Sequence, residues 1–297
     1  MKAWLRLLRV ANLPSALANI LAAFLLTHGS WSPVLTLGWL LIASACLYSA
    51  GMVLNDVFDV ERDREERPGR PLAAGAIDVG LARKVGLGLL FAGVVFAFLA
   101  CWQSGLIAVL LAACVWLYDG PLKRTAIAPF LMGGCRSLNI LMVAATATGE
   151  PWLACWYAGA IGVYVAGITW VARNEAAESQ KSGELYLGSG LVFAGLIAIA
   201  AIVFCPSKMP QIDRKIAKLF PMVATFVFLP ILRRITLACV TQSGTSVKQA
   251  VISCLQSLIL IDALVCLLIA EGRPIYSIVL VGLLVFSFAF KRLSPLT

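Results

Sequence analysis

Three side chains spaced four residues apart form the part of this chain best suited to chemistry: Asn55, Asp59 and Asp63. At 3.6 residues per turn, this spacing places them on one face of a helix, with a drift of about 40° per step. An amide and two carboxylates offer oxygen ligands that suit a hard cation. Mg²⁺ takes one or two carboxylates and completes its shell with water and phosphate oxygens. The spacing therefore predicts a magnesium site at these residues.

Basic residues follow this acidic face. Arg67 and Arg70 offer charge-assisted hydrogen bonds to phosphate oxygens, so the stretch suits a diphosphate bridged by magnesium. The alternative is a solvated loop beside the membrane in which acids and bases pair with one another. The position favours the site, because Asn55 and Asp59 directly follow the apolar run 34–54. Polar groups at a membrane boundary are costly and usually functional, so the helix of this run is expected to continue through them.

The composition of the chain indicates which elements must hold these residues. Of its 297 residues, 61% are hydrophobic and 13% are charged, against roughly 45–50% and about 25% in soluble domains. Apolar runs of about 17–25 residues recur, which predicts membrane-spanning helices, because a helix satisfies its own backbone hydrogen bonds in lipid. We therefore predict an integral membrane protein with an all-α fold, a polytopic transmembrane helical bundle that forms a single domain over residues 1–297.

Ten apolar runs are candidate spans, although the run 216–236 contains Pro221 and Pro230 and could instead lie flat, which leaves nine spans. With ten spans and the N-terminus inside, the loops on the two sides carry 18 and 5 Lys and Arg residues; with nine, the split is 13 to 10. The positive-inside rule favours ten spans, with both termini and the active-site loops on the cytoplasmic side of the inner membrane. The runs are 11–28, 34–54, 85–102, 105–119, 128–148, 152–172, 187–205, 216–236, 249–270 and 275–290.

Several motifs together resemble a known family. The pattern Asn55-x-x-x-Asp59-x-x-x-Asp63, followed by Arg70-Pro-Leu, resembles the first signature of the UbiA superfamily of intramembrane aromatic prenyltransferases. "LLRVANLP" near the start resembles the entry to the family's first helix, and the segment from Tyr118 to Lys123 and Arg124 resembles the one after its fourth helix. The resemblance covers about residues 5–270. It implies nine family-type helices around a central cavity that opens to cytoplasmic loops, and the last apolar run of this chain adds a tenth.

The second acidic motif of the family belongs after the sixth span, and this chain departs from it. Asn174 stands where the first aspartate is expected and Glu178 where the second is expected, with Glu175 as an extra carboxylate. An amide lowers the negative charge that faces a second Mg²⁺, so we predict weaker binding of that ion, or one ion only. The departure resembles a divergent, EboC-like branch of the superfamily.

The resemblance implies roles for individual residues. Mg²⁺ would be held by Asn55, Asp59 and Asp63, with Glu175 and Glu178 opposite. Lys123, Arg124 and Arg70 would bind the departing diphosphate, and Tyr118 would lie near the reacting end of the pocket. The predicted catalytic residues are Asp59, Asp63, Lys123, Arg124 and Tyr118; the predicted substrate-binding residues are Asn12, Arg67, Arg70, Arg136, Asn139, Asn174 and Glu178.

Charged and amide residues also occur inside the spans. Arg136 and Asn139 lie one turn apart in the fifth span, where a charge is expensive and is expected to face a cavity. They could orient an acceptor or form a buried link between helices, and Asp262 in the ninth span raises the same question. Asn12 and Asn19 share a face of the first span and either line the pocket or link helices.

The function implied is Mg²⁺-dependent transfer of an isoprenyl group from an allylic diphosphate to an aromatic or other small acceptor within the bilayer. The net charge of +9 fits the bias of Lys and Arg toward cytoplasmic loops, so no nucleic acid is expected as a partner, and no obligate protein partner is evident. The alternative is a non-catalytic carrier or transporter of a prenyl lipid, with Arg136 and Asp262 as a gating pair. A CDP-alcohol phosphotransferase fits less well, because "DGPLKR" at 119–124 lacks that family's signature.

Overall fold

The described secondary structure is entirely helical, which confirms the all-α prediction. The computed structural model describes residues 2–149, 151–173, 182–202, 214–269 and 274–293. Three short helices are α1 (Lys2–Leu7), η1 (Val10–Asn12) and α4 (Val60–Glu66). The long helices are α2 (Pro14–His28), α3 (Val34–Phe58), α5 (Val79–Ala100), α6 (Trp102–Asp119), α7 (Ala128–Ala144), α8 (Trp152–Arg173), α9 (Ser182–Ala201), α10 (Arg214–Thr241), α11 (Gly244–Ile269) and α12 (Ile275–Leu293).

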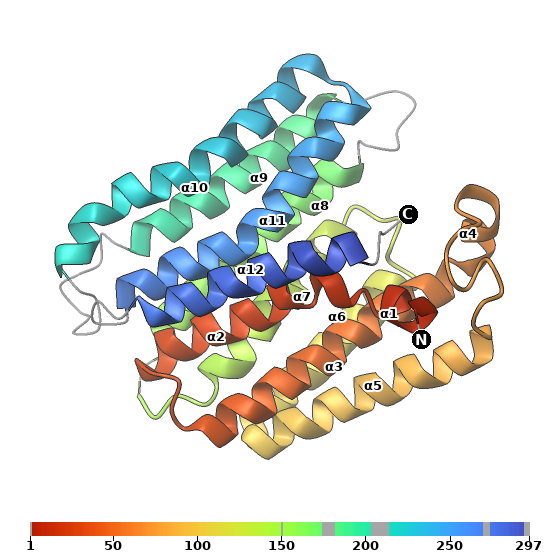
Figure 1. The fold of residues 1–297 in the computed structure, drawn as a ribbon, viewed down its shortest axis with the longest axis horizontal. Coiled ribbons are helices and arrows are strands. Elements are labelled where there is room, and N and C mark those ends of the chain that lie inside the picture. Colours follow the sequence, from red (N-terminus) through yellow and green to blue (C-terminus); the bar gives the residue numbers. More distant parts are fainter. Residues whose placement is uncertain (1, 150, 174–181, 203–213, 270–273, 294–297) are drawn as a thin grey trace.

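The long helices confirm a multi-pass membrane protein. Eight helical segments are long and apolar enough to cross a membrane, and Ala128–Ala144 and Ile275–Ala289 are shorter apolar helices. The doubtful run with Pro221 and Pro230 lies inside α10, which packs along α11 and α9 as the other long helices pack on their neighbours (Figure 1). The number of spans stays a prediction.

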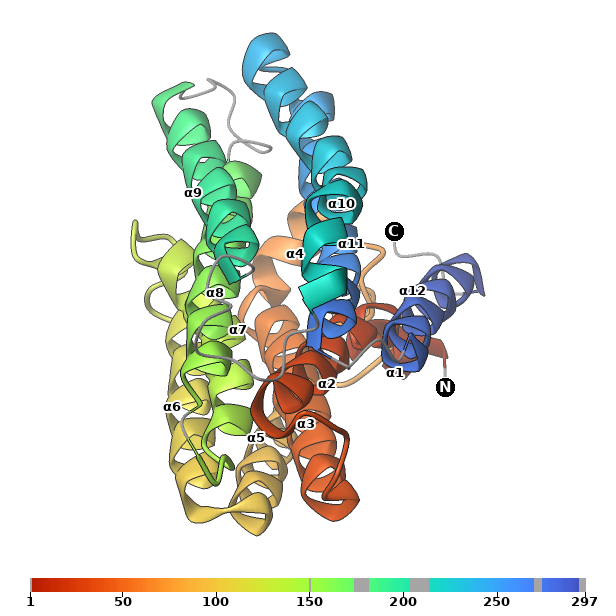
Figure 2. The ribbon, with the colours of Figure 1, turned by 90° about the vertical axis from the view of Figure 1, so that its left-hand side faces the viewer.

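Helix α2 forms the centre of the bundle. It contacts α3, α7, α8, α11 and α12, and its residues 18–26 are all buried. Four of these nine are alanine or asparagine side chains small enough to bring helices close, namely Ala18, Asn19, Ala22 and Ala23. In Figure 2, α6 and α12 lie on opposite sides of the molecule. Helices from both halves of the sequence therefore meet around α2.

Close packing also joins α7 to α8. A side chain at Gly162 would bring its Cβ to 2.0 Å from Ser137 Oγ, and one at Gly133 would lie 2.3 Å from the Gly162 carbonyl oxygen. Glycine lets the two backbones approach, which is the usual role of small residues in membrane helices. The close contact fixes α7, and with it Arg136 and Asn139, relative to α8.

The helix that carries the predicted magnesium motif bends but continues. Helix α3 ends at Phe58, Asp59 has φ −91° and ψ 2°, and α4 starts at Val60. Hydrogen bonds of helical spacing cross this bend: Asp59 N to Asn55 O is 3.0 Å and Asp63 N to Asp59 O is 2.8 Å. The prediction that Asn55, Asp59 and Asp63 continue a helix at the end of the span is confirmed. Helices α1 and α4 lie at the same end of the bundle (Figure 1).

Candidate functional site: a charged cluster beside a cavity

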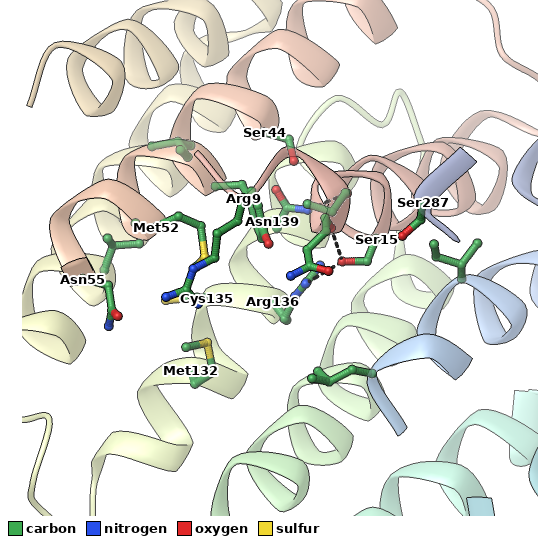
Figure 3. A pocket seen from close by; sticks show the side chains of 18 of the residues that line it. Arg9, Ser15, Ser44, Met52, Asn55, Met132, Cys135, Arg136, Asn139 and Ser287 are labelled. Carbon is green, nitrogen blue, oxygen red and sulfur yellow. Dashed lines mark hydrogen bonds between the residues drawn. The ribbon is translucent and has the colours of Figure 1, made fainter. Parts of the chain in front are cut away.

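A cavity of about 620 Å³ lies among α2, α3, α6, α7, α11 and α12. Its wall includes five residues predicted for the site, namely Asn12, Asn55, Tyr118, Arg136 and Asn139. Figure 3 shows Asn55 and Met52 toward one side of this space and Arg136 and Ser15 toward the other. The cavity wall therefore includes members of two polar clusters.

The first cluster joins α3 to the end of α6. Asn55 Nδ2 donates to Asp119 Oδ1 at 2.8 Å, and Asp119 is only 4% exposed. This hydrogen bond engages the amide nitrogen and turns Asn55 Oδ1 away from Asp119, where it can accept from another donor or bind a cation. Asp119 was not assigned from the sequence, although it directly follows Tyr118 at the end of a span.

Carboxylates and cations pair throughout this cluster. Asp59 accepts from Lys123 Nζ, and Asp63 accepts from Arg70 at 2.6 Å. The structure thus brings the 55–70 stretch against the 118–124 segment, as the two motifs require for a common role. We call Arg9, Asn55, Asp56, Asp59, Asp63, Arg70, Asp119 and Lys123 the charged cluster.

Arg9 and Asp56 are members that sequence reasoning missed. Arg9 donates to Asp56 at 2.8 Å, and Arg70 reaches the same oxygen at 3.3 Å. Arg9 has a left-handed backbone (φ 46°, ψ 46°), which is uncommon for a residue with a side chain and lies where α1 gives way to η1. Both residues stand in stretches that the sequence analysis singled out: Arg9 in "LLRVANLP" and Asp56 directly after Asn55. Neither belongs to the four-residue pattern, so neither was assigned a role.

The two faces of α4 differ, and the difference distinguishes a solvated loop from a binding site. On its outer face Arg62 pairs with Glu66 at 2.7 Å, and both side chains are about half exposed, so the pair contributes little stability. That hydrogen bond lowers the pKa of Glu66 below its ordinary value. In contrast, the side chains of Asp63 and Arg70 are 7% and 18% exposed. The loop interpretation holds for the outer face alone.

The donors of the charged cluster fit Mg²⁺ by their chemistry, because Asn55, Asp59 and Asp63 supply hard oxygen atoms. In the described parts of the chain, no three His, Cys, Asp or Glu side chains converge into a ready-made metal cluster. Asp59 and Asp63 are instead held by Lys123 and Arg70. An Mg²⁺–diphosphate group could replace both partners at once, since the ion matches the carboxylates and the phosphates match the cations.

Other predicted residues lie at or beyond the edge of this cluster. Arg67 and Arg124 are exposed. Asn174, Glu175 and Glu178 lie outside the described residues. Arg173 directly precedes them and donates to the carbonyl oxygens of Lys123, at 3.4 Å, and Thr125, so the end of α8 adjoins the 118–124 segment.

The second cluster surrounds Arg136. It shows whether the polar residues inside the spans line the cavity or link helices. Arg136 donates to Ser15 Oγ at 2.9 Å and to Asn19 Oδ1 at 3.0 Å. Asn19 donates to both oxygens of Asp262 at 2.8 and 2.9 Å, and Tyr157 donates to Asp262 at 2.5 Å. Asn19 thus links helices, Asp262 is the counter-charge of Arg136, and Arg136 both joins the network and lines the cavity. We call Ser15, Asn19, Arg136, Tyr157 and Asp262 the Arg136 cluster.

The fold and these two clusters define a polytopic α-helical membrane protein with a charged site beside an intramembrane cavity. The model of the UbiA prenyltransferase family matches residues 16–230. The chain belongs to that family, as its first motif predicts.

Relatives and solved structures agree with this assignment. Digeranylgeranylglyceryl phosphate synthase of Sulfurisphaera tokodaii is 28% identical over 41% of this chain and 44% of its own length. That of Ignicoccus hospitalis is 30% identical over 50% of this chain and 48% of its own length. The chain thus matches less than half the length of these relatives.

The fold is shared more widely than the sequence. A solved structure of digeranylgeranylglyceryl phosphate synthase in membranes has a TM-score of 0.69 at 19% identity and covers 93% of this chain and 98% of its own. A UbiA homolog from Archaeoglobus fulgidus bound to GPP and Mg²⁺ has a TM-score of 0.65 at 14% identity, covering 86% and 99%.

Proposed function

We propose that this protein catalyses Mg²⁺-dependent transfer of an isoprenyl group from an allylic diphosphate to a small acceptor inside the membrane. The observation that carries the proposal is the charged cluster at the edge of the cavity, in which Asp59 and Asp63 pair with Lys123 and Arg70. The UbiA homolog bound to GPP and Mg²⁺ supports it, because that protein shares this fold.

In this proposal the two halves of each ion pair act on different partners. Asn55, Asp59 and Asp63 hold Mg²⁺, and Glu175 and Glu178 are proposed as further ligands. When bound, the ion stabilises negative charge on the leaving diphosphate. Arg70 and Lys123, with Arg67 and Arg124 at the edge, bind diphosphate oxygens through charge-assisted hydrogen bonds.

The cavity wall protects the allylic cation that diphosphate departure creates. Leu47, Val115 and Ile259 contribute apolar surface that excludes water from this cation. The rings of Tyr48 and Tyr118 also line the space, and aromatic faces attract cations. Tyr118 adjoins Asp119 and is therefore proposed to lie near the reacting carbon.

Two observations suggest which acceptor the protein uses. The names of the relatives point to a glyceryl phosphate acceptor, and the superfamily resemblance points to an aromatic ring. Both offer a nucleophile that an allylic cation can alkylate. We also propose that the charged cluster, with α1 and α4, faces the cytoplasm, since the Lys and Arg count favours that side.

The experiment measures pyrophosphate release by the purified full chain with Mg²⁺ and dimethylallyl, geranyl or geranylgeranyl diphosphate, with and without acceptors. We expect release by the wild type, and its loss in Asp59→Ala and Asp63→Ala. Glu65→Ala, on the exposed side of α4, is the matched control. Absence of release at every chain length would leave a non-catalytic carrier as the better description. Full activity of both aspartate variants would refute the proposed metal site.

A further inference from the structure

The Arg136 cluster lies at a different level of the cavity from Asn55, which lines the cavity at the end of α3. Arg136 lies over the Tyr48 ring, with Cζ 5.9 Å from the ring centroid. Tyr48 precedes Asn55 on α3 by seven residues, which is about 10 Å along a helix at 1.5 Å per residue. Figure 3 shows Asn55 and Arg136 at different places along the cavity. Besides Arg9, the cavity wall therefore carries a second cation, Arg136.

The Arg136 guanidinium is held in place by hydrogen bonds that use only some of its N–H donors. A guanidinium has five N–H donors, and Arg136 uses two of them among the described residues, toward Ser15 and Asn19. Its counter-charge is Asp262, and the two are connected through the side-chain amide of Asn19, which accepts from Arg136 and donates to Asp262. The network thus fixes the orientation of Arg136 and stabilises its charge, while the guanidinium still lines the cavity.

Two further polar side chains with spare hydrogen-bonding capacity, Ser44 and Asn139, lie on the same wall. Ser44 is 1% exposed, and its hydroxyl has no hydrogen-bond partner among the described residues. It lies one turn before Tyr48 on the cavity face of α3. Asn139, one turn after Arg136, donates Nδ2 to the Ala16 carbonyl at 3.2 Å, and its amide nitrogen has a second N–H that can donate to a ligand. A buried unpaired hydroxyl costs free energy that a ligand's hydrogen bond would recover.

We infer that Arg136, with Ser44 and Asn139 beside it, binds the anionic group of the acceptor, a carboxylate or a phosphate, within the membrane. A guanidinium in a low-dielectric cavity attracts an anion strongly and repels a cation. The positive charge of Arg136 therefore keeps an allylic cation toward the side of the cavity that carries the carboxylates. The identity of the ligand as the acceptor rests on the proposed transferase activity; the anion site itself does not.

The test measures equilibrium binding of two matched pairs of probes to the purified full chain by isothermal titration calorimetry. The first pair is 4-hydroxybenzoate and neutral 4-hydroxybenzamide. The second is a glyceryl phosphate with one geranylgeranyl ether and the same glycerol ether without phosphate. The proteins are the wild type, Arg136→Gln, Arg136→Lys and, as the control, Arg83→Gln on the exposed side of α5.

We expect the wild type and Arg83→Gln to bind the charged member of one pair about 10- to 100-fold more tightly than its neutral partner. Arg136→Gln should lose this preference. Arg136→Lys should keep part of it, because lysine keeps the charge but not the planar fork. If Arg136→Gln does not fold, Arg136→Lys decides: a reduced preference supports the inference and an unchanged one overturns it.

Two other results would overturn the anion site: a wild type that prefers neither charged probe, or an Arg136→Gln variant with the wild-type preference. The pair that shows the preference identifies the anion as carboxylate or phosphate. Pyrophosphate release by the wild type is measured in parallel. Release without preference refutes the anion site alone, and preference without release refutes the transferase activity alone.

Discussion

Asp119 offers the sharpest test of how the charged cluster holds a metal ion. The structure gives it one contact that the sequence did not reveal: its carboxylate accepts a hydrogen bond from Asn55 Nδ2 at 2.8 Å, which leaves Asn55 Oδ1 free to bind a metal ion. In Asp119→Ala the amide loses this partner and can rotate. We therefore expect the variant to bind a divalent ion more weakly than the wild type.

The size of this effect follows from the hydrogen bond. Removing one partner of a buried hydrogen bond costs about 1–3 kcal/mol, and Asp119 is nearly buried. Since about 1.4 kcal/mol is tenfold, the affinity should fall roughly 10- to 100-fold, which is also the usual effect of removing a group that orients a metal ligand. Asp119→Asn keeps an oxygen acceptor and should retain most of the affinity.

The assay uses Mn²⁺ in place of Mg²⁺ and measures the concentration of unbound Mn²⁺ by electron paramagnetic resonance. The titration is done with and without a non-hydrolysable allylic diphosphate analogue. The Mg²⁺ dependence of pyrophosphate release is a second measure. Glu65→Ala serves as the control for loss of a carboxylate near the site. Wild-type affinity in Asp119→Ala would refute the orienting role. An Asp119→Asn variant as weak as Asp119→Ala would show that Asp119 is itself a metal ligand.

Two predictions concern stability. Asp262→Ala leaves the Arg136 charge without its counter-charge and Asn19 and Tyr157 without their acceptor, so unfolding in detergent should become easier by about 3–5 kcal/mol; a stability within 1 kcal/mol of wild type would contradict a charged Asp262. Gly162→Ala drives a methyl group against Ser137 and should cost about 1–3 kcal/mol, whereas Gly159→Ala, with nothing within 4 Å of the added Cβ, is the neutral control. Equal melting temperatures for both alanine variants would show that α7 and α8 are not tightly packed.

The local features of this protein follow from its sequence because they depend on neighbouring residues. The apolar runs predict the long helices, and the runs match them closely in order and place. The four-residue spacing of Asn55, Asp59 and Asp63 predicts a shared helical course, and hydrogen bonds of that spacing are present. Even the basic residues of the site were partly evident, since Arg70 and Lys123 lie in recognisable motifs.

The pairings were not evident, because they join residues that only the packing of helices brings together. Asn55 meets Asp119 across 64 residues, Arg9 meets Asp56 across 47, and Asn19 meets Asp262 across 243. Hydrophobic periodicity shows which face of a helix is apolar but not which other helix covers it. In lipid that choice depends on small residues and interhelical hydrogen bonds rather than on burial from water. The helices and the motif can thus be predicted from the sequence, whereas the packing of the helices sets which carboxylate meets which cation.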